Sequence, residues 1–355
     1  MTTVSDAAAG EAGTGGRTPV PGGSTSGPPG RSRGRELALA FTERYALVVL
    51  FVATLIFFSV WSKTSGTFPH ATNIKNVLGG EAYSGILALA IMIPLVCGEF
   101  DFSVGNSAGL TQVLCAGFMA RLGMPLILAI LLPIGIGAFI GLSNGNTVAR
   151  IGVNSLIVTL GVSSVLLGIV EWYTNGQSIS NNISPWLTNI ASDTWFGLPV
   201  TVYILAVAAA VVYYMLEHTP YGRYLYSIGS NRDAARLVGL RVERYVLIAF
   251  VLSGTLAGVA GVLLVVNSGG GNPQAGQIID TLQALAAAYL GATAIKPGRF
   301  NVLGTMIAIY FLAFTVTGLS LAGVADWINS VFDGGALFVA VLVSTIIGRR
   351  RAGTS

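Results

Sequence analysis

Charge is scarce in this sequence. Only 10% of its 355 residues are Asp, Glu, Lys or Arg, whereas soluble domains carry about 25%. Apolar residues make up 53%, and the mean hydropathy is +0.73. A water-soluble surface needs more charge than this, so the composition argues against a soluble enzyme, a nucleic-acid-binding protein and a secreted disulfide-stabilised domain.

Residues that bind metals or nucleotides are also few. The chain has two cysteines, Cys97 and Cys115, and two histidines, His70 and His218, and they form no zinc or disulfide pattern. The phosphate-binding pattern GxxxxGK[ST] does not occur, and no Ser/His/Asp arrangement is visible. We therefore expect no metal site, no cofactor and no ATP hydrolysis in this chain itself, and a membrane-embedded enzyme is a poor interpretation.

Long apolar runs are what the sequence has instead. No charged residue falls in 122–149, 194–216, 245–279 or 300–325, and a membrane-spanning helix needs about 20 mostly apolar residues. The sequence predicts an all-α, polytopic membrane protein with about ten transmembrane helices, of which the second and third are short enough to be half-helices. We place the spans at 45–62, 82–97, 103–120, 124–148, 154–173, 197–216, 245–266, 278–295, 301–320 and 331–348.

The two ends of the chain are polar. Residues 1–34 consist mainly of Gly, Ser, Thr, Pro and Ala and cannot bury a core, so we predict a disordered tail over 1–44, a transmembrane domain over 45–348 and a basic tail over 349–355. With the N-terminus inside, 16 of the 19 Lys and Arg residues fall on the cytoplasmic side and 3 outside. Cytoplasmic loops carry the excess of Lys and Arg, so we expect both termini in the cytoplasm.

Two large loops interrupt the spans. The predicted outer loop, 174–196, is polar and carries Trp186 and Trp195, which fit an aromatic belt at the membrane interface. The predicted inner loop, 217–244, is long and basic, which suits a lever for a separate motor protein. Within it, the run SNRDAARLVGL predicts a short helix that Asn231 caps and Gly239 ends.

A few polar residues within or beside the spans are candidates for a substrate path. Charges near membrane depth are expensive and mark either function or a paired structural site, and Asp101 with Ser103 is equally suited to cap the third span. Amides and hydroxyls suit neutral polyols, but they also serve as polar contacts between helices. Both interpretations remain open for the candidates, which are Glu99, Asp101, Asn106, Asn144, Asn154, Thr159 and Gln283.

Two turns share a weak internal similarity. Gly98-Glu99-Phe100-Asp101, followed by Gly105, corresponds loosely to Gly298-Arg299-Phe300-Asn301, followed by Gly304. Each lies at a predicted inner turn between spans, and transporters are often built from repeated halves. A coincidence between two short glycine-aromatic turns explains the similarity equally well.

Five segments in order resemble one known family. Gly98–Gly105 looks like its G-G-x-D-L-S-V-G motif, Ala138–Ala149 its G-x-x-N-G-x-x-V-A stretch, and Tyr173–Gly176 its Y-T-N-G turn. Thr219–Gly261 is similar to its cytoplasmic segment, and Leu290–Gly304 to its V-L-G-G-T-S-L stretch. Over 45–348 the chain thus resembles the permease subunits of bacterial monosaccharide ABC importers, such as those for ribose, xylose and arabinose. It departs from the family pattern at Glu99, Phe102, Gln283, Ala292 and Lys296-Pro297, which puts the identity of the sugar in doubt.

The resemblance implies an architecture and a set of partners. It implies a type II ABC importer-like permease fold in a bacterial plasma membrane, as a homodimer or paired with a homologous permease. A cytoplasmic ATP-binding subunit, which holds ATP-Mg, would dock on the 217–244 loop, and an extracytoplasmic binding protein would deliver the sugar. An ion-coupled secondary transporter or a channel for a small polar solute is the alternative. The residues expected to couple the chain to the ATPase are Asn231, Ala234, Ala235, Arg236, Leu237 and Gly239.

Overall fold

The structure is a computed structural model that describes residues 33–325 and 327–352. By their contacts, residues 1–40 and residues 41–355 form two separate units. Most of the predicted tail over 1–44 and part of the predicted tail over 349–355 therefore lie outside the described residues. The account below concerns the second unit, which holds all the candidate sites.

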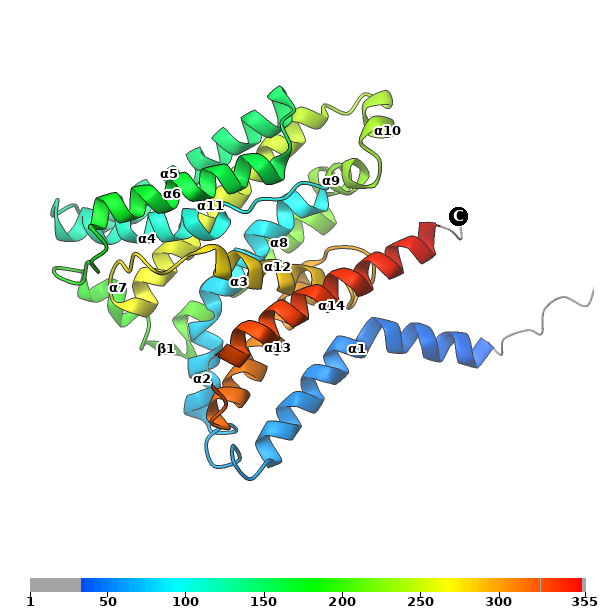
Figure 1. Cartoon of the computed structure of the whole chain (residues 1–355), viewed down its shortest axis with the longest axis horizontal. Coiled ribbons are helices and arrows are strands. Elements are labelled where there is room, and N and C mark those ends of the chain that lie inside the picture. Colours follow the sequence, from blue (N-terminus) through cyan, green and yellow to red (C-terminus); the bar gives the residue numbers. More distant parts are fainter. Residues whose placement is uncertain (1–32, 326, 353–355) are drawn as a thin grey trace, which may run out of the picture. The chain divides into compact units, whose positions relative to one another are not determined.

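Most of the described part of the chain is helical, and a helix lies at each of the ten predicted spans (Figure 1). Two short strands, β1 (Thr194–Trp195) and β2 (Leu198–Pro199), pair antiparallel as a hairpin. The helices are α1 (Arg33–Val60), α2 (Ala71–Gly80), α3 (Ala82–Val96), α4 (Val104–Ala120), α5 (Leu126–Asn146), the π-helix η1 (Thr147–Ile151), α6 (Ser155–Thr174), α7 (Pro185–Asn189), α8 (Val200–His218), α9 (Pro220–Ser230), α10 (Arg232–Leu237), α11 (Val242–Ser268), α12 (Ile278–Gly291), α13 (Val302–Leu321) and α14 (Trp327–Ala352).

Among the residues that the structure describes, six segments are long and apolar enough to cross a membrane, which confirms a polytopic all-α membrane protein. The second predicted span is longer than expected, because α2 leads into α3 with only Glu81 between them, so the segment is not a half-helix. Helix α12 is shorter than predicted and ends at Gly291. The six segments are Ala71–Val96, Leu126–Ile151, Ser155–Thr174, Val200–His218, Val242–Ser268 and Val302–Leu321.

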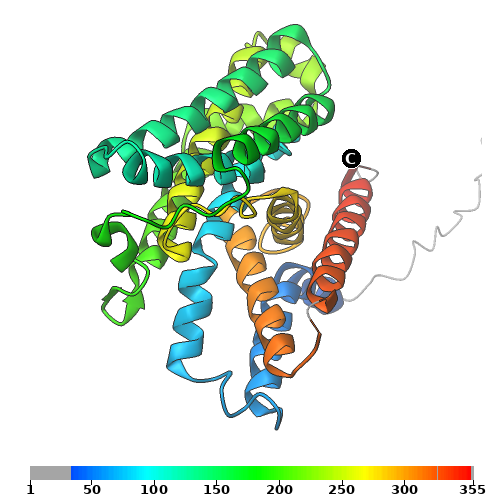
Figure 2. The same cartoon turned by 60° about the vertical axis from the view of Figure 1, so that its left-hand side comes forward.

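Helix α11 lies at the centre of the packing and contacts α3, α4 and α5 (Figures 1 and 2). Glycines allow the close approach of α11 to α5, since a Cβ on Gly254 would lie 2.2 Å from the carbonyl oxygen of Gly137. Small residues at such contacts are the usual way in which transmembrane helices pack. By contrast, α5, α6 and α8 expose large apolar side chains such as Phe139, Ile157 and Val207, as expected for helices that face lipid or another subunit.

Helix α8 separates the two long segments that connect the predicted spans. Helix α7 and the β1–β2 hairpin lie at its start, whereas α9 and α10 follow its last residue, His218 (Figure 1). Its 19 residues span about 28 Å, close to the thickness of a bilayer core. The two long loops predicted from the sequence are thus held at opposite ends of a membrane-spanning helix.

Candidate functional site

A buried polar cluster surrounds Asp101, which is 1% exposed. The backbone N–H and the hydroxyl of Ser103 donate to its Oδ1 at 3.1 and 2.6 Å, and the hydroxyl of Ser253 on α11 donates to Oδ2 at 2.9 Å. Asn144 on α5 donates to the Ser103 hydroxyl at 2.8 Å. Burial raises the pKa of the Asp101 carboxyl, and the hydrogen bonds from Ser103 and Ser253 act in the opposite direction.

Helix α6 holds the chain on both sides of Asp101. The hydroxyls of Ser155 and Thr159 accept hydrogen bonds from the backbone N–H groups of Phe100 and Phe102, at 3.1 and 3.0 Å. Asn106 donates to the carbonyl of Ser163 at 2.6 Å. These contacts fix the loop between α3 and α4 against α6, so the predicted path residues Thr159 and Asn106 are buried at helix contacts.

The remaining predicted path residues lie apart from this cluster. Asn154 is exposed and caps α6, where its side chain accepts from the N–H of Leu156 at 2.9 Å. Gln283 is half-buried on α12. Glu99 points to α10 and is described below. The structure therefore brings together Asp101 and Asn144, places Asn106 and Thr159 beside them, and separates the other three.

Three carboxylates that sequence reasoning missed lie near one another, with Asp280 and Asp333 both close to Glu81. Glu81 follows α2, Asp280 lies in the first turn of α12, and Asp333 lies in α14. The oxygens Glu81 Oε2 and Asp333 Oδ1 are buried without a hydrogen-bond partner among the described residues. Each residue stands alone in the sequence, so only the packing of α3, α12 and α14 reveals the group.

The predicted helix within the 217–244 loop is present as α10. The Asn231 side chain accepts from the N–H of Ala234 at 2.9 Å, which confirms the predicted cap, and Gly239 ends the segment with a φ of 84°. Ala235 is 4% exposed and packs against the chain's own core, whereas Leu237 is 89% exposed. Arg236 pairs with Glu243 at 2.8 Å. The free apolar surface of α10 is therefore Leu237 with its neighbour Val238, which is 77% exposed.

Helices α9 and α10 contact the two glycine-aromatic turns noted in the sequence. Arg232 at the start of α10 forms an ion pair with Glu99, at 2.5 Å. The Tyr226 hydroxyl on α9 donates to the carbonyl of Phe300 at 2.7 Å, and the Arg299 guanidinium lies 3.6 Å from the Tyr226 ring centroid. A cavity of about 650 Å³ opens between these contacts. It is lined by Leu95, Val96, Arg223, Tyr226, Ser227, Gly229, Ser230, Gly298, Arg299 and Phe300.

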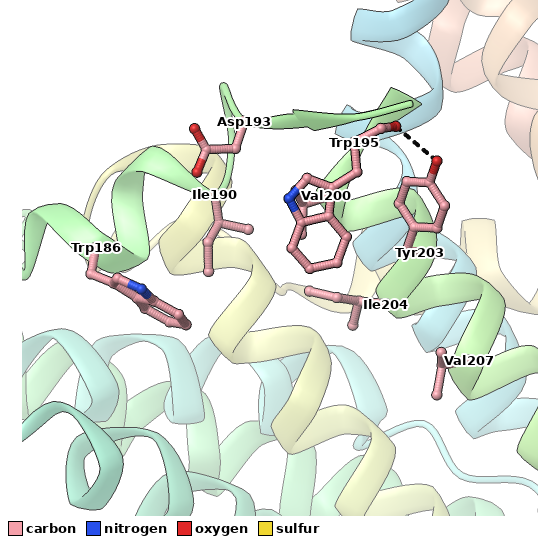
Figure 3. Close-up of a pocket in the computed structure, with 8 residues that line it drawn as sticks. All are labelled: Trp186, Ile190, Asp193, Trp195, Val200, Tyr203, Ile204 and Val207. Atoms are coloured by element: carbon pink, nitrogen blue, oxygen red, sulfur yellow. Dashed lines mark hydrogen bonds between the residues drawn. The ribbon is translucent and has the colours of Figure 1, made fainter. Parts of the chain in front are cut away.

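An open apolar pocket of about 480 Å³ lies at the other end of α8 (Figure 3). Trp186 from α7 and Trp195 from the hairpin stand at its rim, and Ile190 lies between them. The Tyr203 hydroxyl donates to the carbonyl of Trp195 at 2.8 Å and holds the hairpin against α8. Both tryptophans are more than half exposed, as expected for interfacial aromatic residues.

Among the described residues, no group of three or more His, Cys, Asp or Glu side chains is arranged to hold a metal ion. The buried groups are carboxylates, amides and hydroxyls, which exchange hydrogen bonds with one another. Such groups can accept and donate hydrogen bonds to a neutral polar solute.

Comparison with known proteins identifies relatives over nearly the whole described chain. The family model described as "Branched-chain amino acid transport system / permease component" matches residues 73–342. The ribose import permease protein RbsC of Escherichia coli K12 is 30% identical over 298 residues, covering 82% of this chain and 91% of that protein. RbsC of Haemophilus influenzae is 29% identical over 304 residues, covering 85% and 94%. The xylose transport system permease protein XylH of Haemophilus influenzae is 28% identical over 361 residues, covering 85% and 96%. No solved structure matches the chain.

Proposed function

The chain belongs to the family of branched-chain amino acid transport system permease components, and from that premise we propose that it is the membrane-spanning subunit of an ATP-binding-cassette importer for a monosaccharide. The observation that carries the proposal is its similarity, over more than four fifths of its length, to permeases named for ribose and xylose. The family description names amino acids, so the class of substrate is the first point to test.

The partners follow from the same proposal. A separate cytoplasmic subunit binds ATP-Mg and hydrolyses ATP, so the chain itself is not an enzyme and holds no cofactor. Helix α10 supports this division of labour, because Leu237 and Val238 are exposed at the end of a basic segment that is anchored to the transmembrane helices. The chain works as a dimer with itself or with a homologous permease, which would cover part of the apolar surface on α5, α6 and α8.

The opposite end would receive the substrate. An extracytoplasmic sugar-binding protein docks there, and the exposed side chains Trp186, Trp195 and Phe196 offer it aromatic contacts. The carboxylates Glu81, Asp280 and Asp333 lie close enough to one another to act together on a substrate that enters from this side. A sugar presents hydroxyl donors, and unpartnered carboxylate oxygens are strong acceptors for them.

Uptake by a reconstituted complex tests the proposal. The chain is produced together with the ATP-binding subunit and the sugar-binding protein that the proposal requires, and the complex is placed in proteoliposomes with ATP inside. Radiolabelled ribose, xylose, arabinose and leucine are offered separately, with and without an ionophore. We expect ATP-dependent uptake of one pentose that the ionophore leaves unchanged. Uptake of leucine alone would overturn the substrate class, and ATP-independent uptake abolished by the ionophore would favour an ion-coupled transporter.

A further inference from the structure

The two turns that α9 and α10 contact have the same construction. The first turn is residues 97–103 and the second is residues 296–301. Each follows a helix, α3 or α12, and contains a glycine with positive φ, Gly98 at 84° and Gly298 at 80°. Each ends in a side-chain oxygen that accepts a backbone hydrogen bond at the start of the next helix. Asp101 accepts from the N–H of Ser103 at 3.1 Å, and Asn301 accepts from the N–H of Gly304 at 2.8 Å.

The first turn is tied to α10 by a charge pair. Glu99 is 7% exposed, and its Oε1 contacts the guanidinium of Arg232. The nearby backbones are also close, since a Cβ on Gly229 would lie 2.1 Å from the carbonyl oxygen of Val96. A carboxylate this buried depends on its partner, because an unpaired buried charge is strongly unfavourable.

The second turn is tied to α9 by different groups. Tyr226 donates to the carbonyl of Phe300 at 2.7 Å, and its ring lies under the Arg299 guanidinium. At the end of α8, Glu217 pairs with Lys296 at 2.6 Å. The other charged contacts of α10 are local, since Arg236 pairs with Asp233 and Glu243. Arg232 thus provides the charged link from α10 to the helix pair α3–α4.

We propose that the Glu99–Arg232 ion pair is a coupling latch, through which a displacement of α10 is passed to the first turn and so to α3 and α4. The contacts of Tyr226 pass the same displacement to the second turn and so to α12 and α13. One short segment then moves both turns together. Glu99 is a positioning residue in this scheme, which rests on the proposed function because it requires an ATPase that moves α10.

The test separates coupling from assembly. Glu99→Gln, Arg232→Gln and the exchange Glu99→Arg with Arg232→Glu are compared with the parent in nanodiscs and proteoliposomes that contain the ATPase and the binding protein. Three quantities are measured: co-purification of the ATPase, binding-protein-stimulated ATP hydrolysis, and the number of sugar molecules imported per ATP. The solute is radiolabelled ribose or xylose, whichever the parent complex takes up. Matched controls are Glu171→Gln and Arg150→Gln, which remove the same charges from exposed positions on α6 and η1.

We expect both single variants to assemble with the ATPase but to import at least about fivefold less sugar per ATP, and the exchange to recover most of the ratio. The controls keep the parental ratio. A parental ratio in either single variant would overturn the latch, and so would an exchange that assembles but stays uncoupled. Where Glu99→Gln does not accumulate, Glu99→Asp takes its place, since it keeps the charge and shortens its reach. A parent complex that transports neither sugar refutes the substrate class alone, because the ratio is then measured with the solute it does carry.

Discussion

Asp101 illustrates what one buried carboxylate can do in a membrane protein. Its oxygens receive three hydrogen bonds from Ser103 and Ser253, and these residues join the α3–α4 loop to α11. The acceptor-only form of the side chain fits this set of donors. Because Asp101 is buried within the chain, its geometry favours a structural role in holding the first turn over direct contact with a moving solute.

We therefore expect the replacement of Asp101 with Asn to affect folding and transport together, whereas the replacement of Glu99 with Gln affects transport alone. The amide nitrogen of Asn cannot accept from a serine hydroxyl, so one donor is left buried and unpaired at a cost of about 1–3 kcal/mol. We expect Asp101→Asn to lower both membrane abundance and sugar uptake, whereas Glu99→Gln accumulates normally. Quantitative immunoblots of membranes, read beside initial uptake rates, measure the two effects. Parental uptake by Asp101→Asn at equal abundance would show that the cluster is dispensable.

The carboxylates Asp280 and Asp333 differ from Glu99, because neither has a cationic partner among the interactions of the described residues. If they accept hydrogen bonds from a passing sugar, Asp280→Asn and Asp333→Asn should raise the KM for uptake by about five- to tenfold while membrane abundance stays constant. The KM is obtained with the binding protein held at saturation. Glu171→Gln, an exposed carboxylate on α6, serves as the control, and equal KM values in all three variants would exclude a contact with the sugar.

The sequence allowed the local roles of some residues to be predicted, but not the distant partners of others. Asn231 and Gly239 were assigned correctly because a helix cap and a helix stop depend on neighbours in the chain. The partners of Asp101 and Glu99 were not predictable, since Ser253 and Arg232 lie 152 and 133 residues away. Nothing in the spacing of these residues indicates that α11 or α10 meets the first turn. Glu99 was assigned to the substrate path, and that assignment stays a prediction, although its ion pair supports a coupling role.

At the scale of an element, α10 shows that amphipathic pattern and burial must be read together. The sequence analysis assigned Ala234, Ala235 and Leu237 together to the contact with the ATPase, but the structure places Ala235 inside and Leu237 outside. The reason is that α10 is only six residues long, so its inner side packs on the chain's own core while its last residues project outward. In our proposal, the contact with an ATPase therefore involves Leu237 and Val238.

We expect two substitutions on α10 to have different effects, one on binding of the ATPase and the other on accumulation of the chain itself. Leu237→Glu places a charge on the exposed surface, and we expect normal insertion but at least about tenfold weaker binding of the ATPase, as for a buried interface residue. Ala235→Glu forces a carboxylate into the core and should reduce accumulation of the chain itself. Affinity purification and membrane abundance distinguish the two outcomes. An ATPase that binds Leu237→Glu as tightly as the parent would place the docking surface elsewhere.

The positions of the long helices were predictable because each apolar run must be about as long as the bilayer is thick. The predicted span boundaries are wrong in two situations. In one, a polar residue occurs within a continuous helix, and in the other, the apolar run continues beyond the end of the helix. Glu81 interrupts the apolar run but not the path from α2 to α3, and α12 stops at Gly291 although apolar residues continue. The π-helix η1 also escaped prediction, because its hydrogen-bond pattern leaves no trace in hydropathy.

For the whole molecule, the orientation in the membrane follows from where charge gathers. The basic residues Arg223, Arg232, Arg236, Arg241 and Arg244 all follow the end of α8, and Lys296 and Arg299 lie in the second turn beside them. The other end of α8 carries the tryptophan-rimmed pocket. Because cytoplasmic regions are enriched in Lys and Arg, the α10 end faces the cytoplasm in our proposal.

Cysteine labelling and reporter fusions test this orientation directly. Asn182, in the loop before α7, and Asp233, on α10, are both exposed, while the native Cys97 and Cys115 are buried and give little background. In intact cells, a membrane-impermeant maleimide should label Asn182→Cys but reach Asp233→Cys only after permeabilisation, and a reporter fused after Arg351 should be active only in the cytoplasm. The reverse labelling pattern would show that the protein has the opposite orientation in the membrane. It would then place α10 outside, beyond the reach of any ATP-driven subunit, so this one experiment bears on the importer proposal as well as on the topology.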